Sequence, residues 1–150
     1  FIRMKEREPS RLQLVFIGTG EWQPPKREDI HTLGFVSEED KFDAIKASAM
    51  MTVPSFYESL SMVLLEAMSL SVPVLCNGAC QVLQGHCRRS NGGVYYQNFE
   101  EFVQGVSYLL EHGADMGQNG KVYVKQDYRW EVILNKLSAM IDQIREWNDE

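Results

Sequence analysis

Apolar residues in this chain form short continuous runs that alternate with helical stripes. The runs have β-forming character and predict strands at 12–17, 29–36, 49–53, 71–76 and 94–96. Between these runs, apolar residues recur every three or four positions, which predicts amphipathic helices. Strands that alternate with helices indicate a doubly wound α/β fold. We therefore expect a mostly parallel, Rossmann-like sheet of about five strands with helices on both faces.

The last third of the chain is predicted to be helical. A stripe that starts after Asn98 is expected to end at His112-Gly113, because glycine commonly follows a helix. Residues 115–128 are expected to form a polar helical connector, and Arg129 is expected to open a final amphipathic helix. The apolar side of that final helix is interpreted as core and comprises Trp130, Ile133, Leu134, Leu137, Met140, Ile141 and Ile144.

Composition narrows the possible functions. With 150 residues, of which 44% are hydrophobic, the chain can bury one core, so we expect a single domain over 1–150. A formal net charge of -6 argues against a nucleic-acid partner, which would require a basic face. No apolar run approaches the length of about 20 residues that crosses a membrane, and no signal-peptide pattern is present. Three cysteines suggest free thiols, so a cytoplasmic protein is expected.

The first residue is Phe1, and residues 1–8 resemble the end of a helix. We therefore expect the chain to be one part of a longer polypeptide.

The turn at 54–61 and the helix after it carry the candidate chemistry. This turn follows a predicted strand, and ligands of parallel α/β sheets bind at the carboxyl ends of the strands. Glu58 lies in the turn, and Glu66 would lie about 12 Å further along a helix. Between them, the backbone N–H groups near Ser59, Leu60 and Ser61 could hold an anion at the helix N-terminus. Two carboxylates around an anion site suit a nucleotide sugar, which has hydroxyls at both ends and a diphosphate between them.

The segment from Pro54 to Val74 resembles a known family. The pattern E-x7-E from Glu58 to Glu66 follows Pro54-Ser55 and is followed by Leu65-Glu66-Ala67-Met68 and Val72-Pro73-Val74. In this order, these residues are similar to the donor-binding, C-terminal half of retaining group 1 (family four) glycosyltransferases of the GT-B fold.

The resemblance implies a role for each matching residue. Glu58 would contact the hydroxyls of the transferred sugar at the catalytic centre, and Glu66 would hold the ribose hydroxyls. Backbone N–H groups of Ser59, Leu60 and Ser61 would hold the sugar or the diphosphate.

The resemblance adds four residues near the nucleotide. Gly18 and Gly20 would form a glycine-rich turn beside the donor, and Phe35 and Val36 would lie near the nucleotide base.

The resemblance also implies that an N-terminal domain of the same polypeptide binds the acceptor. Transfer would need no metal or other cofactor from this half, because the leaving phosphate of the donor would take the acceptor proton. Because the acceptor-binding domain is not part of this chain, the isolated chain is expected to be inactive.

Several alternatives remain open at this level. The same fold could act as a nucleotide-sugar hydrolase or epimerase. The chain could instead be a non-catalytic interaction module in which Glu58 and Glu66 are ordinary solvated residues. Cys76, Cys80, His86 and Cys87 could be considered as metal ligands, although their spacing does not match common zinc sites. Arg88-Arg89 could bind a phosphate or lie in a solvated loop.

Overall fold

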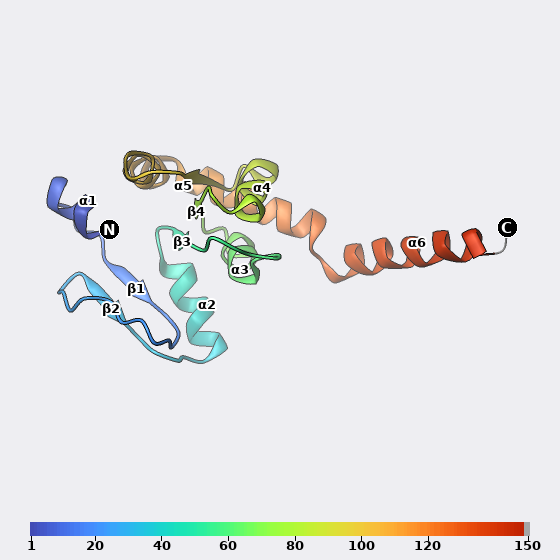
Figure 1. The fold of residues 1–150 in the computed structure, drawn as a ribbon, viewed down its shortest axis with the longest axis horizontal. Coiled ribbons are helices and arrows are strands. Elements are labelled where there is room, and N and C mark those ends of the chain that lie inside the picture. Colours follow the sequence, from blue (N-terminus) through green and yellow to red (C-terminus); the bar gives the residue numbers. More distant parts are fainter. Residues whose placement is uncertain (149–150) are drawn as a thin grey trace. The chain divides into compact units, whose positions relative to one another are not determined.

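The computed structural model describes residues 1–148, with side chains as far as Arg145 (Figure 1). The helices and strands, in chain order, are α1 (Ile2–Arg7), β1 (Leu14–Phe16), β2 (Ile30–Thr32), α2 (Glu38–Ala47), β3 (Met51–Val53), α3 (Met62–Ser69), β4 (Val74–Asn77), α4 (Gln81–Ser90), β5 (Gly93–Tyr96), α5 (Phe99–Asp127) and α6 (Trp130–Asn148). The chain divides into two compact units, the first being Phe1–Ala44 and the second starting at Ile45. We describe each unit separately.

In the first unit, β1 and β2 form a parallel pair in which Leu14 is opposite Ile30 and Phe16 is opposite Thr32. The carboxylate of Asp29, directly before β2, accepts a hydrogen bond from Arg27 at 2.9 Å. This hydrogen bond lowers the pKa of Asp29. Such parallel pairing places the ends of β1 and β2 next to each other, together with the loops that follow them.

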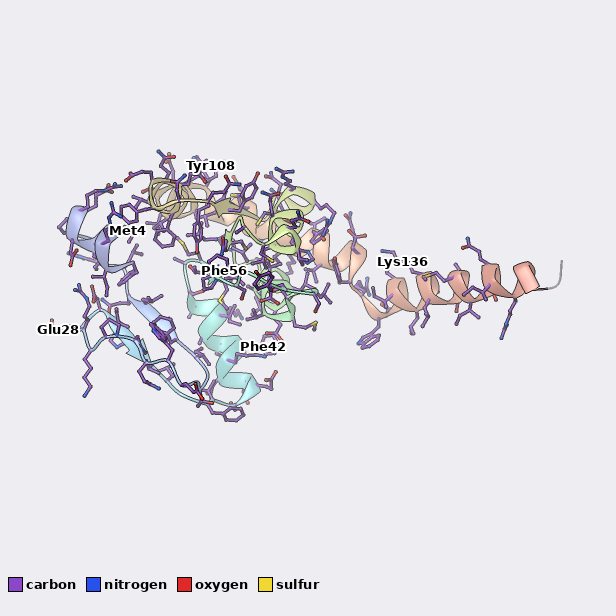
Figure 2. All side chains as sticks on the ribbon, viewed as in Figure 1. Met4, Glu28, Phe42, Phe56, Tyr108 and Lys136 are labelled. Carbon is purple, nitrogen blue, oxygen red and sulfur yellow. The ribbon has the colours of Figure 1, made fainter. Side chains whose placement is uncertain are left out.

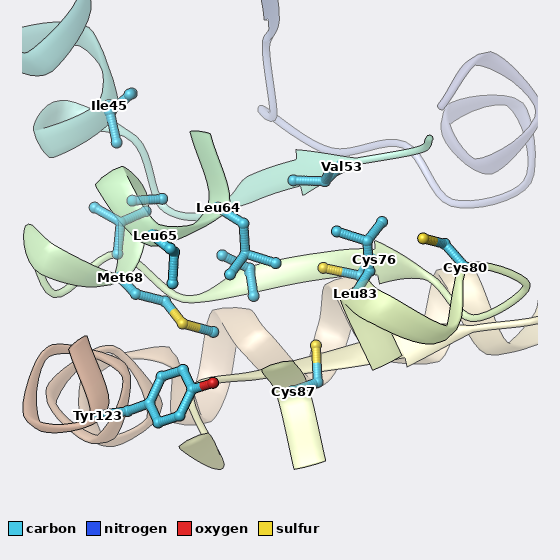
Figure 3. Packing of buried hydrophobic residues seen from close by; sticks show 13 residues of the cluster. Ile45, Val53, Leu64, Leu65, Met68, Cys76, Cys80, Leu83, Cys87 and Tyr123 are labelled. Carbon is cyan, nitrogen blue, oxygen red and sulfur yellow. The ribbon is translucent and has the colours of Figure 1, made fainter. Parts of the chain in front are cut away.

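The second unit contains the parallel sheet β3-β4-β5. All four residues of the central strand β4 are buried, as expected for a strand covered on both faces. Cys76 belongs to a hydrophobic cluster with Leu64 of α3 and Leu83 of α4 (Figure 3). The neighbouring residue Leu75 lies on the other face, where its Cδ1 would be 2.8 Å from a Cβ added at Gly105 of α5. Successive strand residues thus face different helices, which confirms the predicted α/β fold with helices on both faces.

Four of the strands are shorter than predicted, whereas β5 is one residue longer, and the strands form two hydrogen-bonded groups, β1-β2 and β3-β4-β5. Every pairing between these named strands is parallel. An isolated antiparallel bridge joins Arg27 and Ile30 in the turn before β2.

Helix α5 extends from Phe99 to Asp127, so the predicted helix end at His112-Gly113 is wrong. The glycines of this helix serve close packing rather than termination. A Cβ on Gly117 would lie 1.9 Å from the backbone oxygen of Ser71, and one on Gly120 would lie 3.0 Å from Cγ of Met68. The glycines therefore allow α5 to approach α3 and the turn after it.

The interpretation of the α6 stripe as core is also wrong. The residues of this stripe expose between 36% and 77% of their surface; they are Trp130, Ile133, Leu134, Leu137, Met140, Ile141 and Ile144. The apolar periodicity correctly predicted the helix. It could not show which surface the helix contacts.

Candidate functional site

The loop formed by residues 54–61 connects β3 to α3 at the carboxyl end of the parallel sheet. Phe56, labelled in Figure 2, and Tyr57 are exposed near the middle of the loop. Both ends are held by buried side chains. The side-chain amide of Asn77 donates to the carbonyl oxygen of Pro54 at 3.1 Å, and Nε2 of His86 lies 2.9 Å from the carbonyl oxygen of Leu60. The loop is therefore anchored from β4 at its start and from α4 at its end.

Helix α3 begins at Met62, later than the sequence predicted. Of the three residues expected at its N-terminus, only Ser61 is at the helix end, as the N-cap. Ser59 and Leu60 precede it in the loop, because φ of Ser61 is 64° and this left-handed conformation breaks the helical path.

The side chain of Ser61 does not cap the helix. The residue is 5% exposed, and its hydroxyl has no hydrogen-bond partner among the residues that the structure describes. An N-cap serine normally accepts from the second or third N–H group of the helix. The N-terminus of α3 therefore combines backbone N–H groups without a side-chain cap and a buried hydroxyl group, which together suit an anionic ligand.

Glu58 and Glu66 are both half-buried. Glu58 lies in the loop, and Glu66 is the fifth residue of α3. The predicted separation of about 12 Å along a helix does not apply, because the residues between Glu58 and Met62 are not helical. Their shared contact with one ligand stays a prediction.

The other four predicted site residues lie in the first unit. Gly18 and Gly20 follow β1, whereas Phe35 and Val36 follow β2. The backbone N–H of Gly18 donates to the carbonyl oxygen of Gly34 at 2.8 Å, which joins the two loops. The φ angle of Gly18 is 118°, which favours glycine at this position. The structure therefore brings these four residues to one edge of the β1-β2 pair, where the side chain of Phe35 is 88% exposed.

Sequence reasoning missed a polar network in the second unit, centred on the buried side chains of His86 and Tyr123. Nδ1 of His86 lies 3.0 Å from the hydroxyl oxygen of Tyr123, which is 3.1 Å from the hydroxyl oxygen of Tyr128. Nε of Arg89 donates to the same Tyr123 oxygen at 3.1 Å. The histidine was considered only as a metal ligand, and the tyrosines fall in the polar connector at 115–128. Because the members are up to 42 residues apart in the sequence, no local pattern indicated that they meet.

Arg88 and Arg89 both donate hydrogen bonds to tyrosine hydroxyls. Arg88 donates to the hydroxyl of Tyr95 at 3.1 Å from its terminal nitrogen, and Arg89 donates to Tyr123. The hydrogen bond to Tyr123 raises the pKa of Arg89. Both guanidinium groups therefore already contact a polar group of the second unit.

The three cysteines are buried free thiols. Hydrogen bonding with Cys87, together with burial, raises the pKa of Cys76, so this thiol stays protonated. Within residues 1–148, no three His, Cys, Asp or Glu side chains are grouped in a way that could hold a metal ion.

In the described part of the chain, no helix combines the length and the hydropathy needed to span a bilayer.

Comparisons with known proteins agree with this architecture. The family described as "Glycosyl transferases group 1" matches residues 1–112. An uncharacterized glycosyltransferase of Methanocaldococcus jannaschii is 28% identical over 142 residues, which cover 84% of this chain and 36% of that protein. The sucrose-phosphate synthase of Thermosynechococcus elongatus has a similar fold, with a TM-score of 0.76 and 19% identity over 97% of this chain and 41% of that protein. The chain thus spans well under half the length of either protein.

Proposed function

Because the chain belongs to the group 1 glycosyltransferases, we propose that it is the part of a retaining glycosyltransferase that binds the nucleotide-sugar donor. In the full-length protein, the donor would transfer its sugar from a nucleoside diphosphate to an acceptor.

The main observation that supports this proposal is the N-terminus of α3. Its N–H groups have no side-chain cap, and the buried hydroxyl of Ser61 has no partner within residues 1–148. A buried polar group without a hydrogen bond costs free energy, which a ligand that supplies the missing partner would recover. The phosphate oxygens of the donor offer acceptors for the hydroxyl and for the N–H groups at once.

The two glutamates would bind the ends of the donor. We assign Glu58 to the hydroxyls of the transferred sugar and Glu66 to the ribose hydroxyls, since a carboxylate accepts hydrogen bonds from both kinds of group. In the reaction, the bond between the anomeric carbon and the diphosphate oxygen breaks while a bond to the acceptor oxygen forms. The acceptor proton moves to the leaving phosphate, so this chain would supply no metal, other cofactor or general base.

We make a separate proposal for the residues at the edge of the β1-β2 pair. Gly18, Gly20, Phe35 and Val36 would contact the nucleotide, with the exposed ring of Phe35 available to a base.

A second domain of the same polypeptide would bind the acceptor. The lengths of the related proteins support this proposal, because they exceed this chain more than twofold. The exposed apolar stripe of α6 is consistent with a covering partner. The 150-residue chain alone would therefore bind the donor without transferring its sugar.

The three free thiols favour a reducing compartment, so we place the protein in the cytoplasm. The acidic net charge of -6 supports a partner other than nucleic acid.

Calorimetric titration of the full-length protein with UDP, GDP and ADP tests donor binding. We expect one of these to bind, and we expect Ser61→Ala to weaken its binding by about ten- to 150-fold, the effect of losing one hydrogen bond to a charged group. The matched control is Ser69→Ala, at the other end of α3, where the hydroxyl donates to the carbonyl oxygen of Glu66. This control is expected to bind normally.

Three outcomes would contradict parts of the proposal. Absence of heat with all three nucleotides would favour a non-catalytic interaction module. Release of nucleotide from a nucleotide sugar without any acceptor would favour a hydrolase. Turnover of a radiolabelled donor by the 150-residue chain alone would refute the need for a second domain.

A further inference from the structure

We propose that His86 is a positioning residue that fixes the end of the loop 54–61, and with it the backbone that would hold the donor diphosphate. This inference rests on the proposed function for its ligand and on the geometry of the second unit for its mechanism. His86 lies in α4 and is 1% exposed, whereas its bonded partner Leu60 directly precedes the N-cap Ser61.

The hydrogen bonds of the network determine where its protons lie. A carbonyl oxygen only accepts, so Nε2 of His86 carries the proton that it donates to Leu60. Burial lowers the pKa of His86, so the ring is neutral and its Nδ1 atom accepts from the hydroxyl of Tyr123. The Tyr123 oxygen then accepts from Arg89 and from the hydroxyl of Tyr128. Each of these four hydrogen bonds thus pairs a donor with an acceptor, which defines one tautomer and one orientation of the imidazole ring.

The contact with Leu60 has a direct effect on Ser61. The carbonyl group of Leu60 and the N–H group of Ser61 belong to the same planar peptide unit, in which they point in opposite directions. A histidine that holds the carbonyl oxygen therefore aims the Ser61 N–H away from α4. It also supports the left-handed φ of Ser61, a conformation that costs free energy in a non-glycine residue.

The network also connects the loop to the end of α5. Tyr123 lies in α5, and Tyr128 is its C-cap, two residues before the start of α6 at Trp130. The rings of Tyr123 and Tyr128 pack edge to face with their centroids 5.4 Å apart. The histidine is therefore held by α5 as well as by its own helix.

Two substitutions at His86 separate the loop contact from the contact to Tyr123. In His86→Gln, the amide nitrogen takes a place near Nε2 and can still donate to Leu60. In His86→Asn, the shorter amide takes a place near Nδ1, so its oxygen can accept from Tyr123 but the Leu60 carbonyl loses its donor. Both variants remove the ring, which makes them matched controls for packing.

Hydrogen exchange at the amides of residues 60–63 is the first measurement, made on the full-length protein without ligand. We expect His86→Asn to accelerate exchange about three- to tenfold, the factor that corresponds to one lost hydrogen bond, and His86→Gln to stay within about twofold of the unsubstituted protein. Equal acceleration in both variants, or none in either, would overturn the proposal. His86→Leu provides a second route if His86→Asn does not fold. This variant removes the donor to the Leu60 carbonyl oxygen, so it is expected to accelerate exchange at the same amides, and unchanged exchange would overturn the proposal.

Titration with UDP, GDP and ADP is the second measurement. We expect His86→Asn to bind the preferred nucleotide about three- to tenfold more weakly, while His86→Gln binds it normally. If the loop loosens and the unsubstituted protein binds none of the three nucleotides, the proposed function fails while the positioning of the loop by His86 stands. If the loop loosens and nucleotide affinity does not change, the link between His86 and the donor is rejected.

Discussion

The backbone oxygen of Ser71 lies 1.9 Å from the place that a Cβ on Gly117 would occupy. Helix α5 and the turn after α3 are thus in direct backbone contact. This contact supports α3 from the side of the molecule that α5 covers, and α3 carries both Glu66 and the N-cap Ser61.

Gly117→Ala is expected to destabilise the protein by about 3 kcal/mol or more, because a backbone oxygen cannot rotate away from the added methyl group. Gly105→Ala is the matched control, since its methyl group would meet the flexible end of Leu75 at 2.8 Å. Alanine also has the higher helix propensity, so we expect this control to change stability by less than about 1 kcal/mol. Urea unfolding of both variants measures the difference, and similar losses would contradict the close contact at Ser71.

Ser61→Ala is expected to leave stability unchanged or to raise it by up to about 1 kcal/mol. The substitution removes a buried hydroxyl that has no partner among the described residues, and with it a desolvation cost. Thermal unfolding without nucleotide measures the effect. A loss of about 1 kcal/mol or more would mean that the hydroxyl makes a stabilising contact in the free protein, and the site would then need another explanation.

Glu66→Ala is expected to weaken nucleoside diphosphate binding by about 1 to 3 kcal/mol, the usual effect of losing a charged hydrogen-bond partner. Calorimetric titration of the full-length protein checks this value. Glu66→Gln keeps one acceptor oxygen and is expected to lose less. An unchanged affinity in Glu66→Ala would reject the ribose assignment.

The sequence predicted the fold and the order of its elements because both follow from local periodicity. The strand-turn-helix-strand unit around Glu58 and Glu66 is present. The start of α3 was predicted too early. Its true position depends on the left-handed φ of Ser61, which residue type does not indicate.

Two further errors have a common cause. Gly113 looked like a helix end, and the α6 stripe looked like core, because both interpretations used the properties of one segment alone. Gly113 lies instead against Pro73, where a Cβ would come within 3.0 Å of the proline ring. Likewise, no local pattern could bring His86 together with Tyr123, which follows it by 37 residues. The surroundings of Gly113, of the α6 stripe and of His86 all depend on segments that lie far away in the sequence, which a local pattern does not show.

The exposed α6 stripe gives another prediction. Leu137→Asp should change the stability of the 150-residue chain by less than about 0.5 kcal/mol, because Leu137 is 51% exposed there. Leu64→Ala, at a fully buried position of α3, should cost about 2 to 5 kcal/mol. Urea unfolding compares the two, and a large loss in Leu137→Asp would show that α6 is packed in the isolated chain.

The buried imidazole of His86 predicts how stability changes with pH. Burial lowers the pKa of His86 in the folded protein below its ordinary value of 6.5, and the neighbouring Arg89 adds to this shift. Around the ring, Arg89 comes from α4, Tyr123 from α5 and Tyr128 from the α5 C-cap. Burial raises the pKa of Tyr123 to about 12, so its hydroxyl is neutral in this pH range.

The unfolded state therefore binds more protons than the folded state below pH 6.5, so the free energy of unfolding should fall as pH decreases from 6.5 toward the folded pKa. His86→Gln removes the titrating group and should flatten the pH dependence in this range. His31→Gln, at an exposed position in β2, should retain it. Urea unfolding at several pH values between about 7.5 and 5.5 compares the three proteins, and an equal pH dependence in all of them would show that His86 is not buried as a neutral ring.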